Sequence, residues 1–185
     1  MTSLTNQASL PRMDSFNRVL ILLATFFSIA ALSLLIVGTA TYAWHYTQYT
    51  NGTTDYSNLF TRCKGNTTAK TSVCSDIARN TDFGVRTRNA AAFIIVAICL
   101  VGCAMLVILL MNFIQLTTMV LFTAPITLFL ATLFLVATFA EASRAMYLNG
   151  YSAILVQTAH ITTIFTLTII TFACGRLQLY YYNSF

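Results

Sequence analysis

Four long stretches of the chain contain no charged residue, and they constrain its fold more than any other feature. These stretches are Val19–Ala43, Ala90–Phe113, Leu116–Ala140 and Tyr151–Cys174. Each exceeds the roughly 20 apolar residues that a helix needs to cross the hydrocarbon core of a bilayer. The sequence therefore predicts one membrane domain over residues 1–185, with transmembrane helices at about 19–43, 90–113, 116–140 and 151–174.

The low proportion of charged residues excludes several classes of protein. Only 8% of the 185 residues are charged, whereas a soluble domain carries about 25%. Soluble enzymes, nucleic-acid-binding domains and secreted disulfide scaffolds are excluded on this basis. The net charge of +5 does not change this, because six of the ten basic residues lie between the first two spans without a nucleic-acid-binding motif. The expected surroundings are a lipid bilayer, with no nucleic acid.

Two features of the long segment between the first and second spans indicate an extracellular location. It contains two N-glycosylation sequons, Asn51-Gly52-Thr53 and Asn66-Thr67-Thr68, and the cysteine pair Cys63 and Cys74. Glycans and disulfides are both added in an oxidising, lumenal compartment. Counting Lys and Arg in this segment would instead place it inside the cell.

The sequons and cysteines, together with Arg12 and Arg18 before the first span, decide the orientation that we predict. Residues 1–18 and 175–185 are expected to be cytoplasmic, and residues 44–89 and 141–150 to form extracellular loops. The protein is predicted to be a multi-pass plasma-membrane protein with both termini in the cytoplasm.

The five cysteines have different expected roles. A disulfide between Cys63 and Cys74 would close a loop of about a dozen residues and stabilise it by roughly 3 kcal/mol; the alternative is two free thiols. Cys99 and Cys103 lie one helical turn apart, which indicates packing rather than a metal site. Cys174 is either a palmitoylation site or a buried packing residue.

The sequence contains no motif that predicts catalysis or a cofactor. There is no phosphate-binding glycine loop, no zinc-protease motif and no Ser-His-Asp set. We therefore expect no catalytic residue, no metal and no cofactor. Ionisable groups near the spans are limited to the Glu141–Arg144 pair and to His160, which lies three residues after Gln157. A transporter or channel function would have to depend on His160 and Glu141 alone.

A series of residues between the first two spans resembles the claudin superfamily, which includes the peripheral myelin protein, lens MP20-type and channel gamma-subunit families. In order along the chain they are Trp44, Asn58-Leu59-Phe60, Cys63, Cys74 and Arg88. In that superfamily a Trp is followed by a Gly/Asn-Leu-Trp triplet and two cysteines. Phe60 stands where the triplet usually has its second Trp.

The resemblance implies a fold and a set of contacts. The fold is an all-α, left-handed bundle of four transmembrane helices with a small antiparallel extracellular β-sheet in the first loop. The implied disulfide joins Cys63 to Cys74 within this sheet. Leu59 and Phe60 are expected to pack beneath the sheet against the helix ends, with Trp44 anchoring the start of the loop.

Two functions are consistent with this resemblance. The first is a protein of cell contacts or barriers, which self-associates in cis and trans through its extracellular loop. Lys64 and Lys70 would then favour the passage of anions. The second is an accessory subunit that traffics or modulates a channel or receptor through its third and fourth spans. The short second loop, and a tail that ends in Asn183-Ser184-Phe185 without a PDZ-binding motif, favour the second function.

Overall fold

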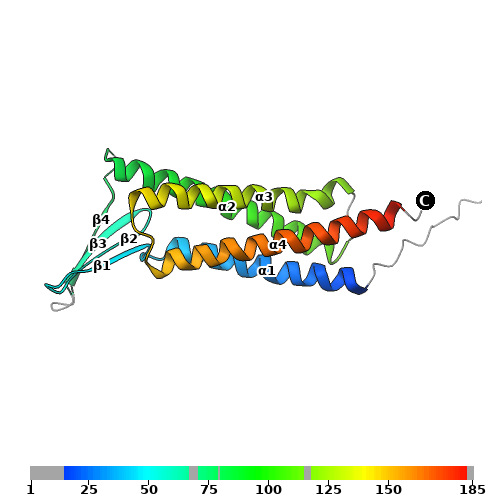
Figure 1. Ribbon diagram of the computed structural model, residues 1–185, viewed down its shortest axis with the longest axis horizontal. Helices are drawn as coiled ribbons and strands as arrows, with labels where there is room; N and C mark the ends of the chain where they lie inside the picture. The colour runs from blue at the N-terminus through cyan, green and yellow to red at the C-terminus, as the bar shows by residue number, and fades with distance from the viewer. Residues whose placement is uncertain (1–14, 67–70, 79, 115–117, 183–185) are drawn as a thin grey trace, which may run out of the picture.

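The computed structural model describes residues 15–66, 71–78, 80–114 and 118–182. It confirms the predicted fold class, because four long helices form a bundle and a small antiparallel sheet lies at one end of it (Figure 1). We refer to this end of the bundle as the sheet end.

All four helices are long and apolar enough to cross a membrane. They are α1 (Ser15–Ala40), α2 (Asp82–Met111), α3 (Thr118–Ala145) and α4 (Tyr151–Tyr182). Several continue past the charge-free stretches, so Glu141 and Arg144 lie on α3 rather than in a loop, and much of the expected tail 175–185 is helical. A charged residue limits burial in lipid, but it does not end a helix whose backbone hydrogen bonds are internal.

The sheet has four strands in the order β1-β2-β3-β4, and each pairs antiparallel with the next. The strands are β1 (His45–Gln48), β2 (Thr53–Ser57), β3 (Thr61–Asn66) and β4 (Thr71–Asp76). Between β1 and β2 the backbone of Gly52 has φ 78°, a conformation that glycine adopts without steric cost. The sheet extends beyond the helices, at the end of the bundle opposite the start of α1 and the end of α4 (Figure 1).

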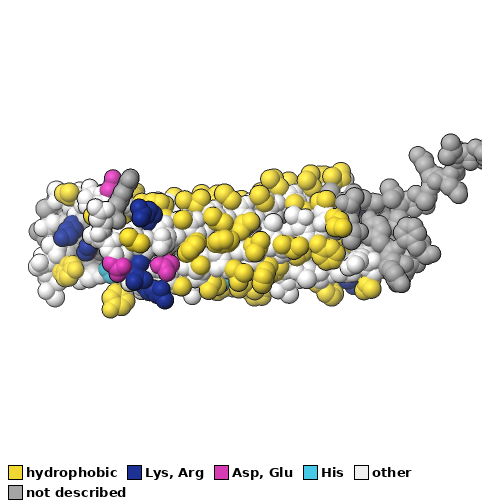
Figure 2. Space-filling model, turned by 90° about the horizontal axis from the view of Figure 1, so that it is seen from above, with side chains coloured by type: hydrophobic (Ala, Val, Ile, Leu, Met, Phe, Trp, Pro, Cys, Tyr) yellow, Lys and Arg dark blue, Asp and Glu magenta, His cyan; other side chains and the backbone are white. Residues whose placement is uncertain are grey.

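Helix packing is pairwise, with α1 mainly against α4 and α2 mainly against α3 (Figure 1). Small residues let the helices approach closely, which matters here because apolar surface gains nothing by leaving lipid. Alanines that are fully buried occur on all four helices: Ala24, Ala31, Ala97, Ala104, Ala131, Ala159 and Ala173. Large apolar side chains cover the outside of the bundle, and charged side chains gather mostly at the sheet end (Figure 2).

Candidate functional site

The start of β1 is fixed to the bundle by Trp44. Its side chain is fully buried, and the indole Nε1 donates a hydrogen bond to the Gly38 carbonyl at 3.0 Å. Its backbone N–H donates to Ser57 on β2, and its carbonyl accepts from Gly150 just before α4. Trp44 therefore joins α1, the sheet and the α3–α4 connection at one point.

The short connection between α3 and α4 is fastened to β1 by a side chain. Asn149 accepts a hydrogen bond from the Tyr46 N–H at 3.0 Å and donates one to the Tyr46 carbonyl at 2.7 Å. Its carboxamide thus occupies the position of a neighbouring strand along the outer edge of β1. Sequence reasoning did not identify Asn149, and the only signal was the turn-forming Asn149-Gly150 dipeptide.

The triplet Asn58-Leu59-Phe60 forms the turn between β2 and β3. The Asn58 side-chain oxygen accepts hydrogen bonds from the N–H groups of Phe60 and Thr61 at 2.7 and 2.6 Å. Leu59 is buried in a core cluster with Trp44, as the resemblance implied. The expectation that Phe60 also packs beneath the sheet is wrong, because 46% of its surface is exposed. Consecutive residues in this turn point in different directions, so only one of the two reaches the core.

Cys63 and Cys74 form a disulfide that joins β3 to β4. They are directly opposite each other in the strand register. Side chains alternate between the two faces of a strand, so the register places the disulfide on one face and Asp55, Arg62 and Lys64 on the other. We refer to the latter as the charged face. The disulfide therefore fastens the sheet without obstructing the charged face.

The charged face is organised by an ion pair between neighbouring strands. The Arg62 Nε donates to Asp55 Oδ1 at 3.1 Å, and its Nη2 donates to Oδ2. The Asp55 side chain is almost wholly buried, whereas half of the Arg62 side chain is exposed. These hydrogen bonds and the neighbouring positive charges hold the pKa of Asp55 below its ordinary value, although burial of the carboxyl opposes this. The same hydrogen bonds raise the pKa of Arg62.

Two cavities extend along the charged face. One, of about 480 Å³, lies over the strands and is lined by Asp55, Arg62, Lys64 and Val73 among others. Lys64 is exposed and directly opposite Asp55 in the register, so it presents a positive charge that has no ion-pair partner among the described residues. Lys70, the other predicted selectivity residue, lies outside the described residues.

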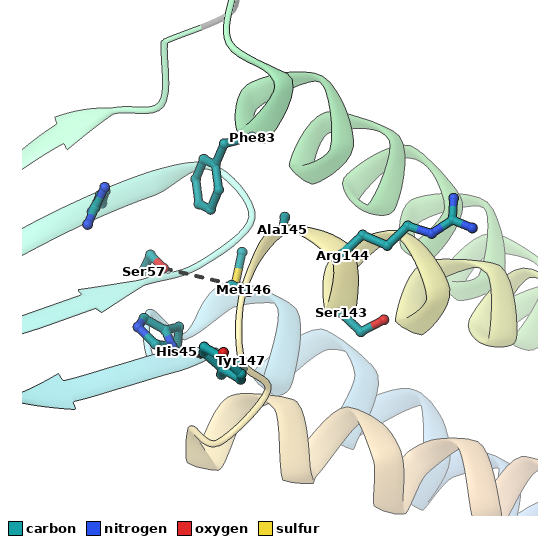
Figure 3. Close-up of a pocket in the computed structure, with 9 residues that line it drawn as sticks. His45, Ser57, Phe83, Ser143, Arg144, Ala145, Met146 and Tyr147 are labelled. Carbon is teal, nitrogen blue, oxygen red and sulfur yellow. Dashed lines mark hydrogen bonds between the residues drawn. The ribbon is translucent and has the colours of Figure 1, made fainter.

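The second cavity, of about 520 Å³, lies between the sheet and the ends of α2 and α3 (Figure 3). Ser57 donates a long hydrogen bond to the Met146 sulfur at 3.9 Å, and His45 Nδ1 lies 3.1 Å from the Tyr147 carbonyl. Phe83 reaches down from α2, while Arg144 points along α3 away from the strands. The contacts around this cavity hold the sheet on the helices. Within the described ranges, no group of three His, Cys, Asp or Glu residues could hold a metal ion.

The remaining predicted residues are dispersed over the molecule. Arg88 is exposed on α2. Asn51 is exposed between β1 and β2, where its side-chain oxygen accepts from the Thr53 hydroxyl at 2.6 Å. Asn66 ends β3 and is exposed, but the rest of its sequon lies outside the described residues. Cys174 is fully buried and donates to the Leu121 carbonyl at 3.5 Å, which favours burial over palmitoylation.

The outer edge of the sheet is β4. All six of its residues are exposed, and among the described residues it pairs with β3 alone. Just beyond β4, the Ile77 N–H donates a hydrogen bond to the Phe60 carbonyl, which precedes β3. Because hydrogen-bonded and non-hydrogen-bonded positions alternate along an antiparallel pair, the backbone groups of Ser72, Cys74 and Asp76 point away from β3. These three residues present hydrogen-bonding groups along an open edge, which is the geometry required for adding another strand.

Comparison with known proteins identifies the group to which this architecture corresponds. A model of the PMP-22/EMP/MP20/Claudin family matches residues 17–178 of the chain. No curated protein sequence matches it.

Proposed function

The chain belongs to the PMP-22/EMP/MP20/Claudin family, and on this premise we propose that it acts at cell contacts or membrane barriers by self-association through its sheet. In this proposal the sheet is extracellular, both termini are cytoplasmic and the protein resides in the plasma membrane. The two sequons and the disulfide in the sheet support this orientation.

The observation that carries the proposal is the open edge of β4. An exposed edge strand pairs readily with another chain unless a charge, a proline or a covering segment blocks it. At the opposite edge of the sheet, Asn149 covers Tyr46 of β1, whereas no described segment covers β4, and its one charged residue, Asp76, is the last residue of the strand. A second copy presenting the same edge would complete the hydrogen bonds of both strands.

A substitution at Ser72 tests the edge directly. Ser72→Pro removes an outward N–H while the bonds between β3 and β4 remain, since the Ser72 N–H points away from β3. Ser72→Ala is the matched control, because it keeps the N–H. In cells that lack junctions, with wild-type protein tagged in two colours, we expect enrichment where two expressing cells touch. Ser72→Pro should abolish this enrichment and Ser72→Ala should retain it.

A uniform surface distribution of the wild-type protein would contradict adhesion between cells. Equal enrichment of the proline and alanine variants would contradict the role of the β4 edge while leaving adhesion in place. The two results separate the function from its mechanism.

Within such contacts, Lys64 is proposed to favour anions. Asp55 is neutralised by Arg62, so Lys64 contributes the uncompensated charge of this cavity. Lys64→Glu should shift the ion preference across a cell layer toward cations. The control is Arg86→Glu, which should leave the preference unchanged, because Arg86 lies on α2 and pairs with Asp82. An unchanged preference in Lys64→Glu would contradict this role.

A second function, as accessory subunit of a channel or receptor, is favoured by the α3–α4 connection. Its described residues form no strand, and Asn149 and Gly150 are both bonded to the start of β1. A connection held in this way is not available to reach an opposing cell. Co-purification in mild detergent tests this function: a stoichiometric channel or receptor would support it, and recovery of the chain alone would contradict it.

A further inference from the structure

The side of α4 that points away from the bundle carries a regular series of exposed side chains, which we call the α4 face. The spacing along it alternates between three and four residues, and its members are Ile154, Gln157, Ile161, Ile164, Thr168 and Thr171. About half of the surface of each isoleucine is exposed. This spacing is the one with which two helices pack side by side at a small crossing angle.

One member of the α4 face lacks a hydrogen-bond partner. Every described Ser, Thr and Asn side chain in the four charge-free stretches makes a hydrogen bond, most often to a carbonyl of its own helix, and Thr168 and Thr171 are among them. The exposed Gln157 carboxamide makes none with the described residues. It borders a groove of about 450 Å³ between α3 and α4, which His160 also lines.

The depth of Gln157 in the membrane decides which groups can bond its carboxamide. The charge-free stretch Tyr151–Cys174 is centred between residues 162 and 163. A hydrocarbon core of about 30 Å with the same centre places Gln157 about 8 Å from the midplane. Water and lipid head groups lie outside this core, and a carboxamide left unpaired in hydrocarbon is costly. Its hydrogen bonds therefore have to come from another transmembrane helix.

The outward side of α3 provides a comparison. It carries a series with the same spacing, in which each member is about half exposed and all are apolar: Ile126, Phe129, Leu133 and Val136. Apolar side chains gain nothing by leaving lipid for another helix. The α4 face differs from this series because it contains a group that lipid cannot satisfy.

We propose that the α4 face binds the α4 face of a second copy of the chain in the same membrane, with the two Gln157 carboxamides hydrogen-bonded to each other. A two-fold axis along the membrane normal relates two copies of the same orientation, so both Gln157 side chains lie at one depth. Each carboxamide donates and accepts, and two of them form a reciprocal pair of hydrogen bonds. Ile154 and Ile161, one turn to either side, exclude lipid from this pair, and the single polar position fixes the register.

This contact goes beyond the proposed function, because it lies within the bilayer and does not involve the sheet. The test uses the full chain in phosphatidylcholine vesicles, labelled at its N-terminus with a donor or an acceptor fluorophore. Energy transfer is measured as the lipid-to-protein ratio is raised. Gln157→Leu removes the carboxamide and Gln157→Asn keeps one. The matched control is Thr158→Val, because the exposed Thr158 hydroxyl donates to its own helix. Ser72→Pro separates this contact from the β4 edge, and thermal unfolding verifies that each variant is folded.

We expect association to weaken about fivefold in Gln157→Leu and to persist in Gln157→Asn, Thr158→Val and Ser72→Pro. Equal association of Gln157→Leu and the wild type would overturn the role of the carboxamide. Loss of association in Ser72→Pro alone would assign self-association to the sheet and overturn the proposal. A wild type that is monomeric at every lipid ratio would overturn the choice of a second copy and indicate a transmembrane helix of a different protein.

Oxidative cross-linking tests the face itself. The background is Cys99→Ser/Cys103→Ser, which removes the two exposed free cysteines. In it, Ile161→Cys should give cross-linked dimers, whereas Leu133→Cys, on the apolar series of α3, should not. Cross-linking through Leu133→Cys and not through Ile161→Cys would overturn the choice of α4.

Discussion

The Asn149 carboxamide bonds both backbone groups of Tyr46, at 3.0 and 2.7 Å, across a separation of 103 residues. Through this contact the α3–α4 connection terminates one edge of the sheet, so that β4 is left as the edge available for pairing. The asymmetry between the two edges underlies the proposed self-association.

Replacing Asn149 with Asp should loosen the edge at β1. The variant keeps the shape of the side chain but loses its donor and places a carboxylate beside the Tyr46 carbonyl. We expect a loss of about 1–2 kcal/mol in the free energy of unfolding and faster amide exchange at Tyr46. Thermal unfolding in detergent and hydrogen exchange measure the two effects. The same change at Asn89, exposed on α2, should alter neither, and equal effects at both positions would contradict the role of the contact.

The Asp55–Arg62 pair should make stability depend on pH in acid. The pKa of Asp55 is lowered in the folded protein from an ordinary value of 3.8, so its stabilising effect is complete above that pH. The effect is lost as pH falls through the lowered pKa and the carboxyl becomes protonated. The difference in melting temperature between the wild type and Asp55→Asn should be constant from neutral pH down to about pH 5 and then shrink below about pH 4.

The exposed pair Asp82–Arg86 provides the control for this pH dependence. Asp82→Asn removes an ion pair whose carboxylate is largely in solvent, and such pairs contribute about 0.5 kcal/mol or less. Its melting temperature should follow that of the wild type at every pH. A pH-independent difference between the wild type and Asp55→Asn would show that the pair stabilises the sheet through packing and not through charge.

Gly150→Ala should be among the most damaging single substitutions. A Cβ at this position would overlap the Ala43 carbonyl, and the Gly150 N–H donates to Trp44 at 3.0 Å. We expect destabilisation of about 3 kcal/mol, measured by thermal unfolding and by the fraction that reaches the cell surface. Gly102→Ala, where an added Cβ meets nothing within 4 Å, is the matched control and should be tolerated. If Gly150→Ala were tolerated, the α1–β1 connection at Ala43 and the α3–α4 connection at Gly150 would have to separate readily.

Reduction of the Cys63–Cys74 disulfide should destabilise the sheet by roughly 3 kcal/mol. A reductant should lower the melting temperature of the wild type and of Cys99→Ser, because Cys99 is a free thiol. It should have no effect on the double variant Cys63→Ser/Cys74→Ser, which starts at the lower value. If the reductant affected the double variant equally, the loss of stability would come from another thiol.

The elements predicted from sequence were those specified by local pattern. Charge-free stretches located the four helices, and the series from Trp44 to Cys74 indicated the sheet through its resemblance to a known family. The helix ends were less accurate, since Glu141 and Arg144 remain helical on α3 although they mark the end of the apolar stretch.

Contacts between distant segments could not be predicted in the same way. Asp55 and Arg62 are both evident in the sequence, but their pairing depends on the register of β2 and β3, which no local pattern specifies. To predict the contact between Asn149 and Tyr46, one would have to know how the α3–α4 connection lies relative to β1 at the sheet end. Gln157 and His160 were evident as polar residues in a span, yet their position at one groove depends on how α3 and α4 separate.

The pairwise packing of the helices has a mechanical consequence for the sheet. Trp44 and Asn149 attach its first strand to the α1–α4 side, while the Ser57–Met146 contact and the passage from β4 into α2 attach it to the α2–α3 side. The sheet therefore spans the line along which the α1–α4 pair meets the α2–α3 pair. Any displacement of one helix pair relative to the other would tilt the sheet and change the angle that β4 presents to a neighbour.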